Sequence, residues 1–277
     1  MPDNGAQKRS HSYRLAIEDP EFMLRDEMRA FRFGMEYAKA ELSLRDWGIR
    51  STIVVFGSAR IPSRDKAERE VAAAQDATQE KEAQRRLTQS VYYERARDFA
   101  RIASLRGGAL APPSAERDNV IATGGGPGIM EAANRGASEV GAPSIGFNIT
   151  LPSEQEPNGY STPALTFRFH YFAMRKMHLA MRANALAIFP GGFGTFDEFF
   201  EILTLVQTRK APTVPILLFG RDYWSEVVNF PALIRHGMVD AEDVALFEMV
   251  DDPEEGWASL VRRGLRAQRA APPPPAS

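Results

Sequence analysis

Six short apolar runs are distributed along the chain, and segments with helical periodicity separate most of them. The runs are residues 51–58, 119–123, 143–149, 165–172, 185–189 and 214–219. Most are continuously apolar, which is typical of strands buried on both faces of a parallel sheet. Because strands alternate with helices, the pattern predicts an α/β fold whose parallel sheet is covered by helices on both faces.

Helical periodicity predicts the remaining elements. Apolar residues such as Phe22, Met28, Phe31 and Met35 recur near a 3.6-residue period, so residues 20–47 are expected to form a helix that packs outside the domain or against a partner. Residues 64–86 are rich in charge and alanine and are interpreted as a solvated helix. The other predicted helices are residues 92–105, 129–140, 173–184, 195–209, 223–234 and 254–265.

The two ends of the chain are polar or proline-rich. We expect residues 1–16 and 269–277 to be disordered tails. Residues 17–268 are expected to form a single domain with an N-terminal helix and a charged insertion at 64–86.

Composition excludes several classes of protein. The 277 residues carry a formal net charge of −2 and no cysteine. We therefore expect no nucleic-acid partner, no disulfide and no thiolate metal site. No apolar run reaches the length of a membrane span, and the N-terminus lacks the apolar core of a secretory signal. The sequence is interpreted as that of a cytoplasmic protein without a membrane partner.

Three of the predicted strands end in small residues. They are followed by Gly57-Ser58, by the glycines of residues 124–128, and by those of residues 191–194. Ligands of open α/β sheets bind at the carboxyl ends of the strands, near a switch in strand order. We therefore expect one pocket built from three loops, with Ser58 able to bond a ligand or simply to cap a helix.

The third loop is the most informative. Its glycines and helix start present bare N–H groups and a positive dipole end, which is typical of a phosphate site. The candidate phosphate ligands are Gly191, Gly192, Gly194 and Thr195. Glu198 follows in the helix, and it has two interpretations: an acid that acts on the sugar of a bound nucleotide, or the Glu of a capping box begun by Thr195.

The second loop contributes Gly125, Gly126 and Glu131 as candidate binding residues. Glu131 falls in the first helical turn, where a surface acid would also complement the dipole. The dinucleotide fingerprint G-x-G-x-x-G fails because Ile129 occupies its third glycine position, and no Lys-Ser/Thr pair completes a P-loop. Nicotinamide enzymes and P-loop nucleotidases are therefore disfavoured.

Arg175 and Lys176 open the predicted helix at 173–184, directly after a strand end. The guanidinium of arginine suits phosphate or carboxylate, although an Arg-Lys pair is often only a solvated helix face.

Taken together, GGGPGIMEAANRGA (124–137), Met174-Arg175-Lys176 and PGGFGTFDE (190–198) resemble the LONELY GUY family over roughly residues 50–235. Members are cytokinin riboside 5′-monophosphate phosphoribohydrolases, often mislabelled lysine decarboxylases. The stretch TLPSEQEPN (150–158) resembles the longer, second type of the family. No pyridoxal-phosphate lysine environment is recognisable, and we expect neither a cofactor nor a metal.

The resemblance implies a Rossmann-like, doubly wound fold and hydrolysis of a nucleoside 5′-monophosphate to free base and ribose 5-phosphate. It implies that Arg175 and Glu198 are catalytic and that the backbone of residues 191–195 holds the phosphate. It also implies a homodimer or larger homo-oligomer with the site near the interface. The base could be a cytokinin-type adenine or plain adenine, and Met130, Phe147, Phe172 and Met174 are candidates for contacting it.

Two other functions remain open at this stage. One is a broader nucleosidase acting on purine or pyrimidine monophosphates. The other is a non-catalytic carrier of a nucleotide or of the molybdenum cofactor, which would need the phosphate loop but not Glu198 beside Arg175.

Overall fold

A seven-stranded sheet forms the centre of the computed structural model, which describes residues 3–112, 115–150 and 156–265. All of its strand pairs are parallel, in the order β4-β3-β2-β1-β5-β6-β7. The strands are β1 (Thr52–Phe56), β2 (Val120–Thr123), β3 (Ser144–Ile149), β4 (Thr166–Phe169), β5 (Ala183–Ile188), β6 (Ile216–Phe219) and β7 (Phe247–Val250). The predicted Rossmann-like, doubly wound α/β fold is confirmed.

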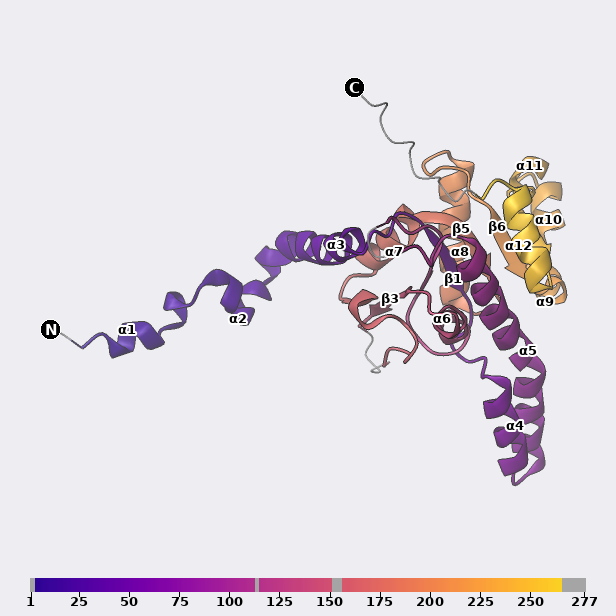
Figure 1. Ribbon diagram of the computed structural model, residues 1–277, viewed down its shortest axis with the longest axis horizontal. Coiled ribbons are helices and arrows are strands. Elements are labelled where there is room, and N and C mark those ends of the chain that lie inside the picture. The colour runs from indigo at the N-terminus through magenta and orange to yellow at the C-terminus, as the bar shows by residue number, and fades with distance from the viewer. Residues whose placement is uncertain (1–2, 113–114, 151–155, 266–277) are drawn as a thin grey trace.

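Helices cover both faces of the sheet (Figure 1). The α-helices are α1 (Gly5–Arg9), α2 (Pro20–Met23), α3 (Arg29–Asp46), α4 (Arg64–Ala73), α5 (Ala77–Arg106), α6 (Ile129–Glu139), α7 (Phe172–Met181), α8 (Phe193–Gln207), α9 (Arg221–Val227), α10 (Phe230–Arg235), α11 (Ala241–Val244) and α12 (Pro253–Arg262). Helices α5, α6 and α12 form one connected layer, and α3 packs on α7.

The strand order reverses between β1 and β5. Their register is level at the carboxyl ends, where Phe56 pairs with Ile188. Beyond the strands, the segments that follow β1 and β5 stay hydrogen-bonded, because the Ser58 amide donates to the Pro190 carbonyl at 3.0 Å. The loops after β1 and β5 therefore meet at the switch point, which is where ligands of doubly wound sheets bind.

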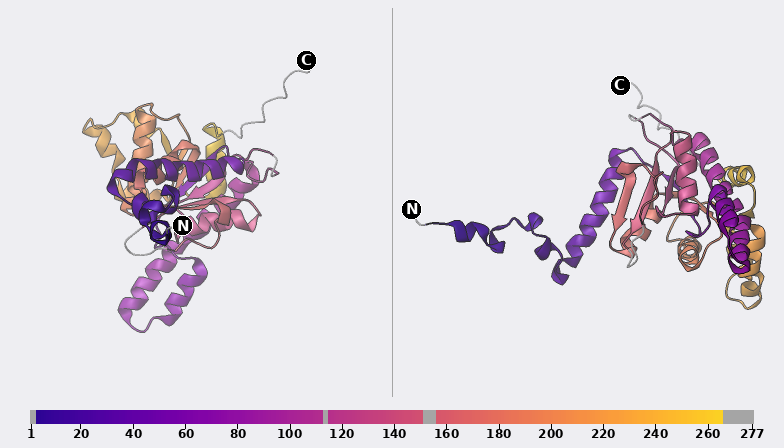
Figure 2. Two further views of the ribbon diagram at one scale, coloured as in Figure 1. Left: turned by 90° about the vertical axis from the view of Figure 1, so that its left-hand side faces the viewer. Right: turned by 90° about the horizontal axis from the view of Figure 1, so that it is seen from below.

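The charged insertion differs from its prediction. Instead of one helix over 64–86 and another over 92–105, the structure has a helical hairpin of α4 and the 30-residue α5, which projects from the body (Figures 1 and 2). The Asp76 carboxylate accepts the amides of Thr78 and Gln79 and so caps the start of α5. Arg86 ties the two helices together by donating twice to Glu70, at 2.6 and 3.1 Å.

The N-terminal segment extends away from the body as an arm (Figures 1 and 2). The prediction of one helix over 20–47 was wrong in its first part, because α2 ends at Met23 and a 3-10 turn, Asp26–Met28, precedes α3. Residues 3–16 form short helical turns without a buried side chain, whereas the predicted tail at 269–277 lies outside the described residues. None of the described helices has the length and apolarity needed to cross a membrane.

Candidate functional site

A cavity of about 670 Å³ lies at the switch point of the sheet. The loop after β1 supplies Gly57, Ser58 and Arg60, and the loop after β2 supplies Gly124. Residues 191–196 form a further part of the wall, together with Arg175, Glu198 and Tyr223. The structure therefore brings the three predicted strand ends to one cavity.

The backbone of residues 191–195, called the cradle from here on, has the exposed amides and the helix start that suit an anion. Helix α8 begins at Phe193, two residues earlier than predicted, and its N-cap Gly192 offers no side chain. The amides of Thr195 and Phe196 both donate to the Gly192 carbonyl, at 2.9 and 3.1 Å. Within the described residues, no acceptor engages the amides of Gly192, Phe193 and Gly194, as expected at the start of a helix. A Cβ added at Gly192 or Gly194 would meet no atom within 4 Å, so this backbone faces open space.

Thr195 and Tyr223 contact the cradle at Gly191 and fix its conformation. A Cβ on Gly191 would lie 2.1 Å from the Thr195 Oγ1, so only glycine permits this approach. The hydroxyl of Tyr223 donates to the Gly191 carbonyl at 2.5 Å. Thr195 is itself buried, and its side chain packs against the turn instead of pointing freely into the cavity.

Glu198 and Arg175 form a buried ion pair on the cavity wall. The Arg175 Nη2 donates to the Glu198 Oε1 at 2.9 Å, and Glu198 is 4% exposed. Burial raises the pKa of Glu198 above its ordinary value, while the nearby charges of Arg175 and then Lys176 oppose this rise. Burial thus disfavours the charged form of the Glu198 carboxyl group relative to that of a solvent-exposed glutamate.

The capping-box interpretation of Glu198 does not match the structure. Because α8 starts at Phe193, Glu198 lies more than one turn inside the helix, and no side chain caps the N-terminus. Its carboxylate bonds Arg175 instead of a backbone amide. Glu198 is therefore free of a capping role and faces the cavity.

Arg175 is positioned by packing on two sides. Its guanidinium lies 5.2 Å from the ring centroid of Phe172, and Nη1 lies 3.6 Å from where a Cβ on Gly124 would be. Its buried Nε has no acceptor among the described residues. An unpaired buried donor beside a cavity is a further sign that a ligand completes the site.

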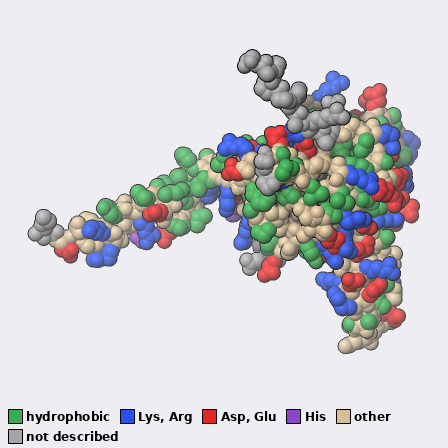
Figure 3. All heavy atoms as spheres, in the orientation of Figure 1, with side chains coloured by type: hydrophobic (Ala, Val, Ile, Leu, Met, Phe, Trp, Pro, Cys, Tyr) green, Lys and Arg blue, Asp and Glu red, His purple; other side chains and the backbone are tan. Residues whose placement is uncertain are grey.

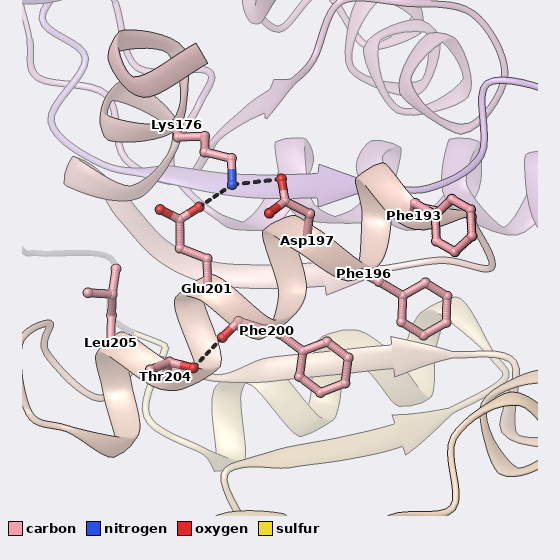
Figure 4. A pocket seen from close by; sticks show the side chains of 8 residues that line it. All are labelled: Lys176, Phe193, Phe196, Asp197, Phe200, Glu201, Thr204 and Leu205. Atoms are coloured by element: carbon pink, nitrogen blue, oxygen red, sulfur yellow. Dashed lines mark hydrogen bonds and ion pairs between the residues drawn. The ribbon is translucent and has the colours of Figure 1, made fainter.

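Lys176 does not line this cavity, contrary to its predicted binding role. Its ammonium forms ion pairs of 2.7 Å with Asp197 and with Glu201 (Figure 4). These three side chains belong to a separate groove along α8, of about 660 Å³, whose apolar wall includes Phe193, Phe196 and Phe200. Helical spacing explains the difference, because consecutive residues of α7 point in different directions.

The second glycine loop is also placed differently from its prediction. Gly125, Gly126 and Glu131 do not line the cavity, and only Gly124 of this loop does. The side-chain amide of Asn158 donates to the carbonyls of Gly125 and Gly126 at 3.0 Å. Glu131 accepts a hydrogen bond of 2.8 Å from the Tyr93 hydroxyl of α5. These residues connect elements to one another.

Two cavity residues, Arg60 and Tyr223, were not singled out from the sequence. Arg60 follows the small residues after β1, so its position two residues beyond Ser58 was an available signal. Tyr223 lies in α9, and no local motif marks it. Of the base-contact candidates, Met130 lines the cavity, whereas Phe147 is 1% exposed and stacks on Phe167 in the core. The described residues contain no group of three or more His, Asp or Glu side chains placed to hold a metal ion.

Comparison with known proteins gives a family match in the part of the chain that holds Arg175 and Glu198. Residues 130–260 match a family model described as "Possible lysine decarboxylase". This is the label that LONELY GUY proteins, which the sequence resembles, often carry in error. The recognition of this family in the sequence is confirmed. No curated protein matches the chain significantly.

Solved structures give more distant matches. A molybdenum cofactor binding protein from the phototrophic bacterium Rippkaea orientalis is 17% identical, with a TM-score of 0.46 over 77% of this chain and 96% of that one. A structural genomics target, TM1055, is 18% identical, with a TM-score of 0.46 over 76% of this chain and 99% of that one.

Proposed function

Because residues 130–260 carry the domain of this family, we propose that the protein hydrolyses the N-glycosidic bond of a nucleoside 5′-monophosphate. The substrate is a cytokinin riboside 5′-monophosphate or AMP, and the products are the free base and ribose 5-phosphate. The observation that carries the proposal is the buried Arg175–Glu198 pair sharing one cavity with the bare amides of residues 192–194.

The phosphate end of the substrate binds at the start of α8. The free amides of Gly192, Phe193 and Gly194 and the helix dipole attract the phosphate. No charged side chain has to lose its hydration for this purpose. Since a carboxylate repels a phosphate, Glu198 faces the ribose rather than the 5′ group. Binding energy gained at the phosphate thereby fixes the anomeric carbon relative to the carboxylate.

Bond cleavage passes through an oxocarbenium-like state. Glu198 stabilises that positive charge and takes a proton from the attacking water. The bond from the anomeric carbon to the base nitrogen breaks as the bond to the water oxygen forms. The base leaves with the electron pair and takes up the proton that Glu198 accepted from the water. The raised pKa of Glu198 suits a group that accepts a proton in one step and returns it in another.

Arg175 has two roles in this proposal. It orients the Glu198 carboxylate through the 2.9 Å bond, and its positive charge opposes the rise in the pKa of Glu198 that burial causes. Its remaining donors, including the unpaired Nε, are available to the ribose or the phosphate. Ser58 lies at the phosphate side of the cavity, and Met130 supplies apolar surface for the base.

We further propose that the protein acts in the cytoplasm as a homodimer or a larger homo-oligomer. Phe193 is 95% exposed and lines both the catalytic cavity and the apolar groove of α8 (Figure 4). The arm also exposes large apolar side chains, including Leu15, Ile17 and Leu24 (Figure 3). Exposed apolar patches of this kind mark interaction surfaces. Light scattering on the full chain tests this, and Phe200→Asp in the groove is expected to lower the mass.

A base-release assay tests the proposed reaction. The protein is incubated with AMP, isopentenyladenosine monophosphate, GMP and CMP, and free base is measured. Release from the adenine nucleotides supports the proposal, and equal release from GMP and CMP supports the broader nucleosidase. Binding without release from any of them supports the carrier function.

A further inference from the structure

A second cavity adjoins the candidate site at its phosphate end. It has a volume of about 290 Å³ and shares Ser58, Arg60, Gly191 and Tyr223 with the larger cavity. Neither Arg175 nor Glu198 lines it. The smaller cavity therefore continues from the cradle in a direction away from the catalytic carboxylate.

Arginine dominates the polar wall of this second cavity. Arg85 and Arg86 of α5 line it together with Arg60, and the single acidic side chain among its lining residues is Glu82. Arg86 is engaged by Glu70, while Arg85 approaches Glu82 only at 3.4 Å. The exposed side chain of Arg60 forms no ion pair with any residue that the structure describes. The cavity thus carries more positive than negative charge, and part of its donor capacity is unused.

We propose that this second cavity is a subsite for the terminal phosphate of a nucleoside 5′-diphosphate. The inference rests on the proposed binding of the first phosphate at residues 192–194. A phosphoanhydride places the second phosphate immediately beside the first, and the arginine cavity is the neighbouring space on the side opposite the ribose. The planar guanidinium of arginine matches phosphate oxygens in geometry and charge.

The size of the cavity supports an extension of one ligand more than a separate ligand site. Pockets for complete small molecules usually span about 300–1,000 Å³, and this one lies just below that range. Part of its wall comes from α5, where Glu82, Arg85 and Arg86 belong to the charged insertion of residues 64–86. The proposal therefore gives this insertion a function in ligand selection.

The test measures binding by calorimetry on the full-length chain carrying Glu198→Gln, so that no ligand is cleaved. We expect ADP to bind about tenfold more tightly than AMP, which corresponds to roughly one charge-assisted hydrogen bond. Arg85→Gln in the same background removes most of this difference and leaves AMP affinity unchanged. Arg69→Gln, an exposed arginine of α4 that lines neither cavity, is the matched control and keeps the difference.

The possible results separate this inference from the proposed function. If AMP binds and the wild-type protein cleaves it, but ADP binds no tighter, the subsite is wrong and the proposed function stands. If ADP binds more tightly than AMP but both Arg85→Gln and Arg60→Gln keep this difference in affinity, the second phosphate does not bind in the arginine cavity and the proposal is overturned. If orthophosphate tightens AMP binding while ADP shows no gain, the cavity takes free phosphate and the diphosphate assignment is overturned. If AMP does not bind at all, the cradle and the subsite fail together.

Discussion

Two glycine loops of similar sequence have opposite surroundings in this protein. Residues 124–128 and 190–194 each follow a strand and precede a helix, and each is followed by a glutamate, Glu131 or Glu198. In the first loop, Asn148 and Asn158 contact the backbone so closely that it is closed by protein atoms. In the second loop, Gly192 and Gly194 face open space.

The comparison shows that glycine serves two physical purposes here. In the first loop its absent side chain allows tight packing between elements, since Gly128 lies against the Ser58 carbonyl. In the second loop Gly191 likewise allows the close approach of Thr195, whereas Gly192 and Gly194 leave the backbone facing open space. The position of the loop relative to the switch between β1 and β5, and not its composition, decides between these purposes.

The glutamates that follow the two loops give the largest predicted difference. Glu198→Gln is expected to lower kcat for AMP by about 10²–10⁴, the usual contribution of a general base, while AMP still binds. Glu131→Gln is expected to leave kcat nearly unchanged because its carboxylate bonds Tyr93 outside the cavity. Base release measured by chromatography compares the two. Near wild-type turnover by Glu198→Gln would refute the assigned role.

Alanine at one glycine of each loop separates stability from binding. Gly125 has φ of +71°, and a Cβ there would lie 2.4 Å from the Asn148 Nδ2, so Gly125→Ala is expected to cost ~1–3 kcal/mol of stability. Gly192→Ala is expected to leave the melting temperature unchanged, because its φ is −95° and the space is open, but to weaken AMP binding. Thermal unfolding and calorimetry check both. Unchanged AMP affinity in Gly192→Ala would place the phosphate elsewhere.

The pH profile tests the effect of the Arg175 guanidinium on the neighbouring Glu198. Burial raises the pKa of Glu198, so kcat/KM is expected to fall with decreasing pH at a higher pH than for an ordinary carboxylate. Arg175 lowers that pKa, so Arg175→Gln moves the acidic limb to still higher pH as well as reducing the rate. Profiles for wild type and Arg175→Gln measure the shift. If the acidic limb of kcat/KM lies at the same pH in both proteins, the ionisation of Glu198 does not control kcat/KM.

The smallest effect is expected at Lys176. Its ammonium pairs with Asp197 and Glu201 at the edge of the groove, so Lys176→Gln removes two partly exposed ion pairs, each worth about 0–1 kcal/mol of stability. We expect AMP turnover to change little, unlike that of Arg175→Gln, its neighbour in sequence. A large rise in KM for Lys176→Gln alone would return it to the binding site.

Local patterns were sufficient for most of the fold. Apolar runs identified β1 to β6. The runs of β1, β2 and β6 are continuous because these strands are buried on both faces, whereas that of β4 alternates. Strand β7 was missed because its four residues include Glu248, which is tolerated at the sheet edge. The sequence analysis also missed that residues 77–106 form one helix. The first half of α5 is charged and mostly exposed and the second half is largely buried, so the two halves show different patterns of apolar residues.

The loops and helix starts that follow strand ends gave part of the candidate site correctly. Arg175, Glu198 and the glycines of residues 191–194 belong to such segments, and they share one cavity. Lys176 and Glu131 follow the same motifs, but their direction depends on helix rotation and on partners such as Tyr93 that lie far away in sequence. Tyr223 reaches Gly191 across 32 positions, and no local pattern indicates that contact.

A crystal structure of the Glu198→Gln protein soaked with AMP tests the central claim most directly. The account predicts the 5′-phosphate within hydrogen-bonding distance of the amides of Gly192, Phe193 and Gly194, with the ribose toward residue 198. A phosphate bound at residues 124–128, or anywhere away from the start of α8, would contradict it.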